Sequence, residues 1–184
     1  MSIIAIIVSK MDHPLGEVLA PIQACPEISG IRIVRGVDGI FARWEALLSL
    51  PSANQIVYTQ DDDAVVDVAA VLREFDPHKL TCNMPPAHRR DYRDDIALVG
   101  WGAVFLAALP IHALARYDTA TYESDGIFVR ECDRVVAGLS PLKLIDVPIR
   151  HLPQAYGENR MGGEKRHGDD LREIRRRIYA IRGK

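Results

Sequence analysis

The residues of this sequence best suited to chemistry are three consecutive aspartates, Asp61, Asp62 and Asp63. They follow an apolar segment, residues 55–59, that is typical of a buried β-strand. Adjacent carboxylates repel one another, so their ionised forms are costly unless a cation neutralises them. Carboxylate oxygens are the ligands that Mg²⁺ and Mn²⁺ prefer, and both ions also bind phosphate oxygens. The triplet therefore predicts a divalent metal site for a phosphate-bearing substrate.

A simpler explanation is that one of the three aspartates caps the helix expected after them, because Asp is favoured at helix N-termini. A cap accounts for one aspartate and not for three, so the metal interpretation is preferred. Because a strand alternates its side chains, Asp61 and Asp63 are expected to face one ligand while Asp62 points elsewhere.

The elements that must position the triplet alternate between strand and helix in the first half of the chain. In order, they are predicted over residues 3–8, 15–22, 30–34, 40–50, 55–59 and 65–75. Such repeats favour a mostly parallel sheet flanked by helices on both faces, with ligands bound at the carboxyl ends of the strands. The triplet lies at this edge.

The second half of the chain is less regular. Strands are predicted over residues 79–83, 96–99 and 142–147, helices over 104–109, 112–115, 125–139 and 170–181, and a glycine-rich, charged loop over 156–168. The expected architecture is a single α/β domain spanning residues 1–184, in which residues 156–184 form a flexible loop and a C-terminal helix.

Composition narrows the class of protein. The 184 residues are 48% hydrophobic and 26% charged, as expected for one compact domain, and the net charge of −2 gives no general attraction for nucleic acid. Three widely spaced cysteines indicate neither a disulfide framework nor a cysteine zinc site. No apolar run approaches the roughly 18 residues of a transmembrane helix, so we expect a soluble, cytoplasmic protein.

The segment from Ile56 to Asp63 resembles the DxD region of GT-A-type glycosyltransferases, particularly small bacterial, phage-type and exostosin-like members. Gly36–Trp44, Gly100–Phe105 and Glu123–Asp125 lie in register with further segments of that family. The resemblance implies a GT-A-like, Rossmann-like fold. It also implies transfer of a sugar from a nucleotide-diphosphate-sugar donor to a hydroxyl acceptor, with Mn²⁺ or Mg²⁺ as cofactor.

The resemblance assigns roles to individual residues. Asp61 and Asp63 would bind the metal, and His167, in competition with His151, would complete its shell. The residues expected to bind the nucleotide-sugar are Asp61, Arg43, Asp38, Trp101, Gly102 and Arg160. The Arg43 guanidinium would bind a phosphate or an acidic neighbour. Two of these residues have equally simple explanations: Arg43 as an exposed helix arginine, and Asp38 as a turn former.

The expected catalytic base is Asp125, which would take the proton from the acceptor hydroxyl, with Glu123 as the alternate. Asp125 is equally suited to cap a helix. Whether the transfer inverts or retains the sugar's configuration stays open. The alternatives to a glycosyltransferase are a nucleotidyltransferase or phosphohydrolase on a similar sheet, or a non-catalytic nucleotide- or saccharide-binding module.

Overall fold

The computed structural model describes residues 2–9, 14–35, 39–86, 97, 99–119, 126–152 and 164–183. The helices are α1 (Gly16–Gln23), the short 3₁₀ helix η1 (Gly39–Phe41), α2 (Ala42–Leu48), α3 (Val68–Arg73), α5 (Ala108–Thr119), α6 (Gly126–Leu139) and α7 (Glu164–Arg182). The strands are β1 (Ile3–Ser9), β2 (Ile28–Arg35), β3 (Ile56–Asp61), β4 (Ala64–Val66), β5 (Leu80–Asn83), β6 (Ala103–Leu106), β7 (Leu142–Ile145) and β8 (Ile149–His151).

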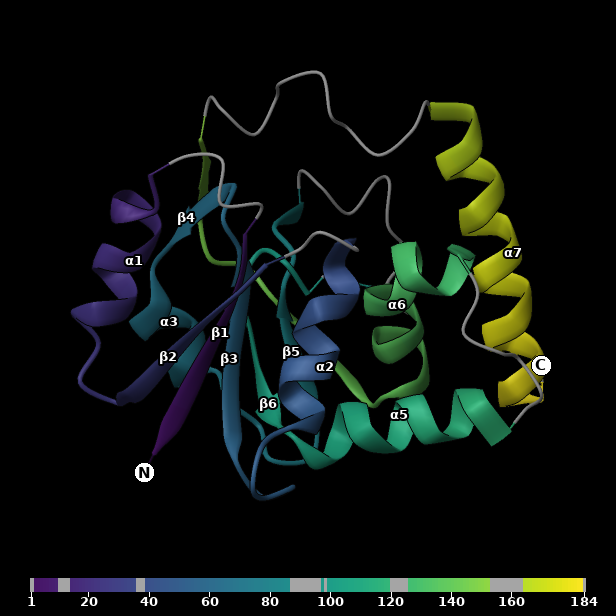
Figure 1. Ribbon diagram of the computed structural model, residues 1–184, viewed down its shortest axis with the longest axis horizontal. Coiled ribbons are helices and arrows are strands. Elements are labelled where there is room, and N and C mark those ends of the chain that lie inside the picture. The colour runs from purple at the N-terminus through teal and green to yellow at the C-terminus, as the bar shows by residue number, and fades with distance from the viewer. Residues whose placement is uncertain are drawn as a thin grey trace.

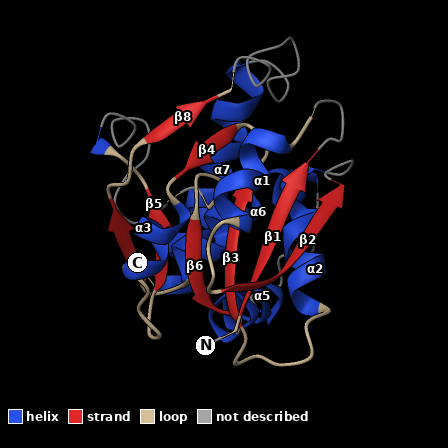
Figure 2. Cartoon of the chain, turned by 90° about the vertical axis from the view of Figure 1, so that its left-hand side faces the viewer, coloured by secondary structure: helices blue, strands red, loops and turns tan. Residues whose placement is uncertain are grey.

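Six of these strands form a central sheet in the order β2-β1-β3-β6-β5-β7. All of them run parallel except β6, which is antiparallel to both of its neighbours, β3 and β5. The two remaining strands, β4 and β8, pair with each other in a small second sheet beyond the carboxyl ends of β1 and β3 (Figure 2). The expected fold class, a mostly parallel sheet flanked by helices, is confirmed.

Helices cover both faces of the sheet: α1 and α3 lie on one side, and α2, α5, α6 and α7 lie on the other (Figure 1). Each face carries its own apolar cluster. Ile6 of β1 belongs to the cluster under α2, α5, α6 and α7, whereas the neighbouring Ile7 belongs to the cluster under α1 and α3. This alternation explains why β1 is apolar from Ile3 to Val8, because a parallel strand covered on both faces has no solvent side.

The structure corrects three predictions. Residues 104–109, expected to be helical, contain most of β6, and α5 begins at Ala108. No strand includes the described residues Ala97 and Val99 of the expected strand over 96–99. Helix α7 begins at Glu164, inside the expected loop over 156–168. Short apolar segments of four to six residues do not distinguish a buried strand from a helix by period, which explains the first error.

In the described part of the chain, none of the helices combines the length and apolar character needed to cross a bilayer.

Candidate active site at the end of β3

The acidic triplet forms the turn between β3 and β4. Strand β3 ends at Asp61, and Asp62 and Asp63 form the turn itself. The backbone of this turn is held at both ends, because Asp61 N donates to Gly100 O at 2.8 Å and Leu152 N donates to the carbonyl oxygen of Asp63 at 2.9 Å. The triplet therefore lies at the carboxyl edge of the central sheet, as predicted.

None of the three aspartates caps the next helix. Strand β4 follows the triplet, and α3 begins later with Asp67 as its N-cap, whose side chain accepts a hydrogen bond from Ala70 N at 2.9 Å. The expectation that a helix follows the triplet directly is therefore wrong. Asp62 and Asp63 lie in a turn, so the alternation of side chains along a strand, from which Asp61 and Asp63 were expected to face one ligand, does not apply to them. All three side chains are partly buried.

Two buried side chains support the turn from below. The Gln60 side chain spans the triplet, with its Nε2 donating to Ala64 O at 3.0 Å. The hydroxyl of Tyr58 donates to the other end of the same amide, Oε1 of Gln60. Both residues are 0% exposed, so these bonds are protected from water. The shape of the acidic turn is thus set by the protein before any ligand binds.

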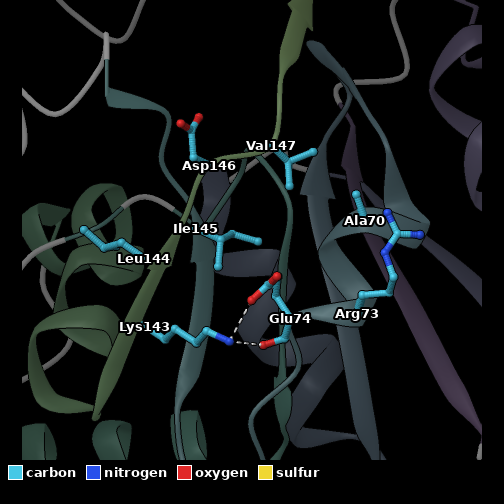
Figure 3. Close-up of a pocket in the computed structure, with 8 residues that line it drawn as sticks. All are labelled: Ala70, Arg73, Glu74, Lys143, Leu144, Ile145, Asp146 and Val147. Carbon is cyan, nitrogen blue, oxygen red and sulfur yellow. Dashed lines mark hydrogen bonds and ion pairs between the residues drawn. The ribbon is translucent and has the colours of Figure 1, made fainter.

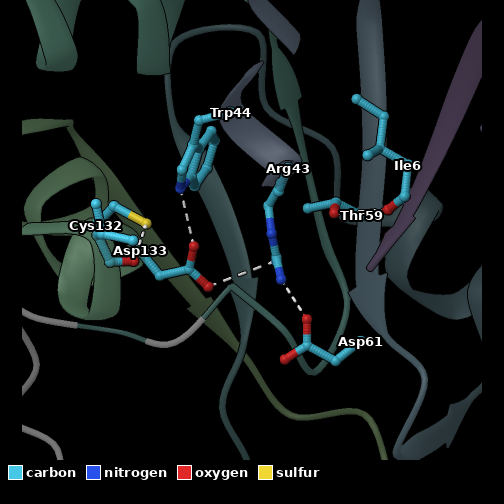
Figure 4. Close-up of polar contacts among 8 residues, drawn as sticks. Ile6, Arg43, Trp44, Thr59, Asp61, Cys132 and Asp133 are labelled. Atoms are coloured by element: carbon cyan, nitrogen blue, oxygen red, sulfur yellow. Dashed lines mark hydrogen bonds and ion pairs between the residues drawn. The ribbon is translucent and has the colours of Figure 1, made fainter. Parts of the chain in front are cut away.

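Asp61 takes part in a buried charge network with helices α2 and α6, shown in Figure 4. Arg43, 0% exposed, donates from Nη2 to Asp61 Oδ1 and places its Nη1 3.5 Å from Oδ2 of Asp133. Trp44 Nε1 donates to Asp133 Oδ1 at 3.0 Å. In the described structure, Arg43 therefore lies between two carboxylates, and its buried guanidinium does not reach the surface.

The charges of this network depend on one another. Burial lowers the pKa of Arg43, but the nearby Asp133 and Asp61 outweigh that effect and the pKa is raised, so the guanidinium stays protonated. Burial raises the pKa of Asp133 to about 6, opposed by the attraction of Arg43. Burial also raises the pKa of Asp61, and the attraction of Arg43 again opposes this shift. The attraction of Arg43 therefore favours the ionised forms of both carboxylates.

Asp63 has no such partner. Its Oδ1 is buried and accepts no hydrogen bond within the described residues. Burial, followed by repulsion from Asp61 and Asp62, raises the pKa of Asp63 to about 7. A buried carboxylate oxygen without a donor is costly, and a bound cation would remove that cost.

The loop before β6 closes the other side of the turn. A Cβ atom on Gly100 would lie 2.1 Å from Asp61 Oδ2, so only glycine fits there without displacing that carboxylate. Gly102 has a φ of +96°, which also favours glycine. Between them, the partly buried Trp101 ring meets the His151 ring edge-on, with centroids 5.4 Å apart. The buried Asn83 amide donates to the Trp101 carbonyl at 3.1 Å and so holds the loop in place.

The residues present fit a divalent cation that is completed by substrate. Within the described ranges, no three His, Cys, Asp or Glu side chains are grouped as a metal site. Mg²⁺, however, is commonly bound by only one or two carboxylates together with substrate phosphates. Asp63 offers an oxygen without a hydrogen-bond donor, and the adjacent Asp61 is already oriented.

Other predicted site residues are placed differently. Asp38, Glu123, Asp125 and Arg160 lie outside the described residues, so the catalytic base stays a prediction. His167 belongs to α7, but its side chain is outside the described part.

The competing histidine, His151, lies on β8 directly opposite Ala64, the residue that follows the triplet. The fold therefore brings His151, and not only the aspartates, to this end of the sheet.

Sequence reasoning missed Asp133 as a member of the charge network beside the acidic turn. Asp133 lies far from the triplet in sequence, in the part of α6 where residues 131–139 are all buried. The only available signal was a pair of adjacent charged residues, Asp133 and Arg134, in the otherwise mostly apolar stretch of residues 132–139.

A recess lies between α3 and β7 and is shown in Figure 3. Its volume is about 370 Å³, and it is lined by Ala70, Arg73, Glu74, Lys143, Leu144, Ile145, Asp146 and Val147. Its main polar feature is the ion pair between Lys143 Nζ and Glu74 Oε2, at 2.9 Å. None of the residues predicted for the active site lines this groove, so the acidic turn is the better candidate.

No protein-family model matches the chain, and no curated protein matches it. Among solved structures, it is similar to the 2-C-methyl-D-erythritol 4-phosphate cytidylyltransferase of Francisella tularensis, with a TM-score of 0.50 and 12% identity. That match covers 79% of this chain and 90% of the other. The 4-diphosphocytidyl-2C-methyl-D-erythritol synthase of Anaerococcus prevotii has a TM-score of 0.46 and 13% identity, covering 95% and 96% of the two chains.

At these identities the likeness concerns the fold alone, and only the first score is high enough to define a shared fold. The likeness to the Francisella tularensis enzyme agrees with the expected Rossmann-like architecture. The resemblance to glycosyltransferases gains no support beyond that architecture.

Proposed function

We propose that this protein is a metal-dependent transferase that acts on a nucleotide substrate at the end of β3. The observation that carries the proposal is the buried, unpartnered Oδ1 of Asp63, beside two further carboxylates on a turn that the protein holds rigidly. Asp63 and Asp61 would hold Mn²⁺ or Mg²⁺. When bound, such an ion stabilises the negative charge on a leaving phosphate.

The first candidate reaction is nucleotidyl transfer. The fold likeness to a cytidylyltransferase favours it, and it was the stated alternative to sugar transfer. In this reaction an acceptor oxygen attacks the α-phosphorus of a nucleoside triphosphate, and the bond to the pyrophosphate leaving group breaks. The chain's own contribution is to fix the carboxylates that anchor the phosphates, because a positioned site needs little rearrangement during the reaction.

Glycosyl transfer is the second candidate. The observation that favours it is Trp101, which lies partly buried on the loop that contacts Asp61 and offers an apolar ring beside the acidic turn. Here the bond between the sugar's anomeric carbon and the diphosphate breaks, an acceptor hydroxyl forms the new bond and loses its proton, and a nucleoside diphosphate leaves.

The proposal is tested by thermal unfolding of the full chain with nucleoside triphosphates and with nucleotide-sugars, each with and without Mn²⁺. We expect a nucleotide to raise the melting temperature only when Mn²⁺ is present, because a ligand that binds the folded state stabilises it. Asp63→Asn should abolish this increase. Asp67→Ala, which removes a nearby helix cap, should lower the melting temperature and preserve the increase.

Equal stabilisation of wild type and Asp63→Asn, or no response to any nucleotide, contradicts the proposal. The released product then separates the two reactions: pyrophosphate from a triphosphate identifies nucleotidyl transfer, and nucleoside diphosphate from a nucleotide-sugar identifies sugar transfer.

A further inference from the structure

Arg43 and Asp133 form an ion pair that contacts the acidic turn directly. Both side chains are buried, at 0% and 2% exposed, whereas Asp61 is 27% exposed. The network therefore runs from the interior of α6, through the guanidinium, to a carboxylate that reaches solvent (Figure 4). Buried ion pairs contribute little net stability compared with apolar side chains of similar volume, so folding alone does not call for this one.

Charge balance explains why an arginine here needs a second carboxylate. Arg43 orients Asp61 through a hydrogen bond, but its positive charge also repels any cation bound to the same carboxylate. Asp133 supplies a compensating negative charge on the far side of the guanidinium. Together, Arg43 and Asp133 provide a directed donor to Asp61 and no net charge.

The placement of Asp133 is itself controlled. Its Oδ1 accepts the indole N–H of Trp44, a fully buried residue adjacent to Arg43 in α2. On the opposite side of the network, the backbone of Gly100 lies against Asp61 Oδ2 and leaves no room for a side chain. Asp61 is thus confined between the guanidinium and the Gly100 backbone.

We propose that Asp133 is a positioning residue of the metal site, which holds and neutralises Arg43 so that Arg43 can orient Asp61 toward a bound divalent cation. This inference rests on the proposed function, since it requires that the acidic turn binds such a cation. In metal sites, groups that orient the ligands commonly change metal affinity by about 10-fold to 100-fold when they are removed.

The test is a titration of the full chain with Mn²⁺ alone, read out as the dissociation constant, alongside urea unfolding of each variant. Asp133→Asn retains the shape and the oxygen that accepts from Trp44 but removes the charge. We expect it to weaken Mn²⁺ binding by about 10-fold to 100-fold. The control is Asp170→Asn, which breaks a partly buried ion pair, with Arg130 at 2.7 Å, on the α6–α7 side. It should lower stability and leave Mn²⁺ binding within about twofold of wild type.

A double variant separates positioning from simple loss of structure. Arg43→Met combined with Asp133→Asn removes both charges, so no uncompensated cation faces the metal. It should bind Mn²⁺ at least about threefold more tightly than Asp133→Asn alone. If Asp133→Asn does not fold, Trp44→Phe, which keeps both charges and frees Asp133, is compared instead and should weaken Mn²⁺ binding by about fivefold.

The outcomes are distinct. Wild-type affinity for Mn²⁺ in Asp133→Asn, or in Trp44→Phe where that variant replaces it, overturns the positioning role while the proposed function stands. A double variant that binds Mn²⁺ no more tightly than Asp133→Asn overturns it as well. A wild-type chain that binds Mn²⁺ neither alone nor together with a nucleotide overturns the proposed function itself.

Discussion

Two ion-pair clusters of this protein contrast in burial and in what they contact. The Arg43 cluster is closed to water and touches the acidic turn. The pair between Lys143 and Glu74, beside the groove at β7, is 33% and 49% exposed and touches no predicted site residue. Water and salt screen the exposed pair, whereas the buried charges interact strongly and each depends on its partner. Burial is therefore what makes the charges of the first cluster depend strongly on one another.

The largest expected effect comes from breaking the buried cluster. Arg43→Met leaves Asp133 with no counter-charge in the interior, and we expect the free energy of unfolding to fall by about 3–5 kcal/mol. Urea unfolding at neutral pH measures it. A loss below about 1 kcal/mol would mean that the two clusters do not differ in the way described.

A smaller effect is expected at the glycine that contacts this cluster. Gly100→Ala places a Cβ 2.1 Å from Asp61 Oδ2, and the required displacement should cost about 1–3 kcal/mol and weaken Mn²⁺ binding. Gly16→Ala, in α1, is the control, because its added Cβ meets nothing within 4 Å. The control should be neutral or slightly stabilising. Equal effects at both positions would show that the close approach at Gly100 is unimportant.

The unpaired carboxylate of the site predicts a specific pH dependence. With a pKa of about 7 in the folded state and an ordinary value in the unfolded state, Asp63 lowers stability as the pH rises from about 4 to 7. Asp63→Asn lacks this loss. It should match wild type near pH 4 and exceed it by about 1 kcal/mol at pH 8 without metal. Parallel stability curves for the two proteins between pH 4 and 8 would contradict this assignment.

The smallest effect belongs to the exposed pair. Lys143→Met should change the free energy of unfolding by about 0.5 kcal/mol at low ionic strength, because solvent-exposed pairs are worth little. The difference from wild type should shrink further in 1 M salt. Measuring the free energy of unfolding of both proteins at two salt concentrations tests this expectation. A salt-independent loss above about 2 kcal/mol would contradict the small contribution expected of an exposed pair.

Much of the fold could be predicted from the sequence. Runs rich in isoleucine and valine, separated by amphipathic segments and by glycine or proline, gave the order of elements from β1 to β3 and the position of the acidic triplet at a strand end. Strand β6 was misread as helix because a strand buried on both faces loses its alternation of polar and apolar residues.

The candidate site was only half predictable for a different reason. The triplet is contiguous in sequence and could be recognised from residue types alone. The bond between Trp44 and Asp133 joins residues 89 positions apart, and no local pattern relates them. Only packing of α6 against the sheet creates that neighbourhood, and with it the link between Asp133 and the site.

The reversed direction of β6 has a consequence for where catalytic loops can come from. In a sheet whose strands all point one way, the segment entering a strand lies at the edge opposite to the segments leaving its neighbours. Because β6 alone is inverted, its entry loop, Gly100 to Gly102, meets the exits of β3 and β5, bonding to Asp61 and Asn83. Turning one strand around thus adds an entry loop to a rim otherwise built from strand exits, so that segments distant in sequence can evolve together around one site.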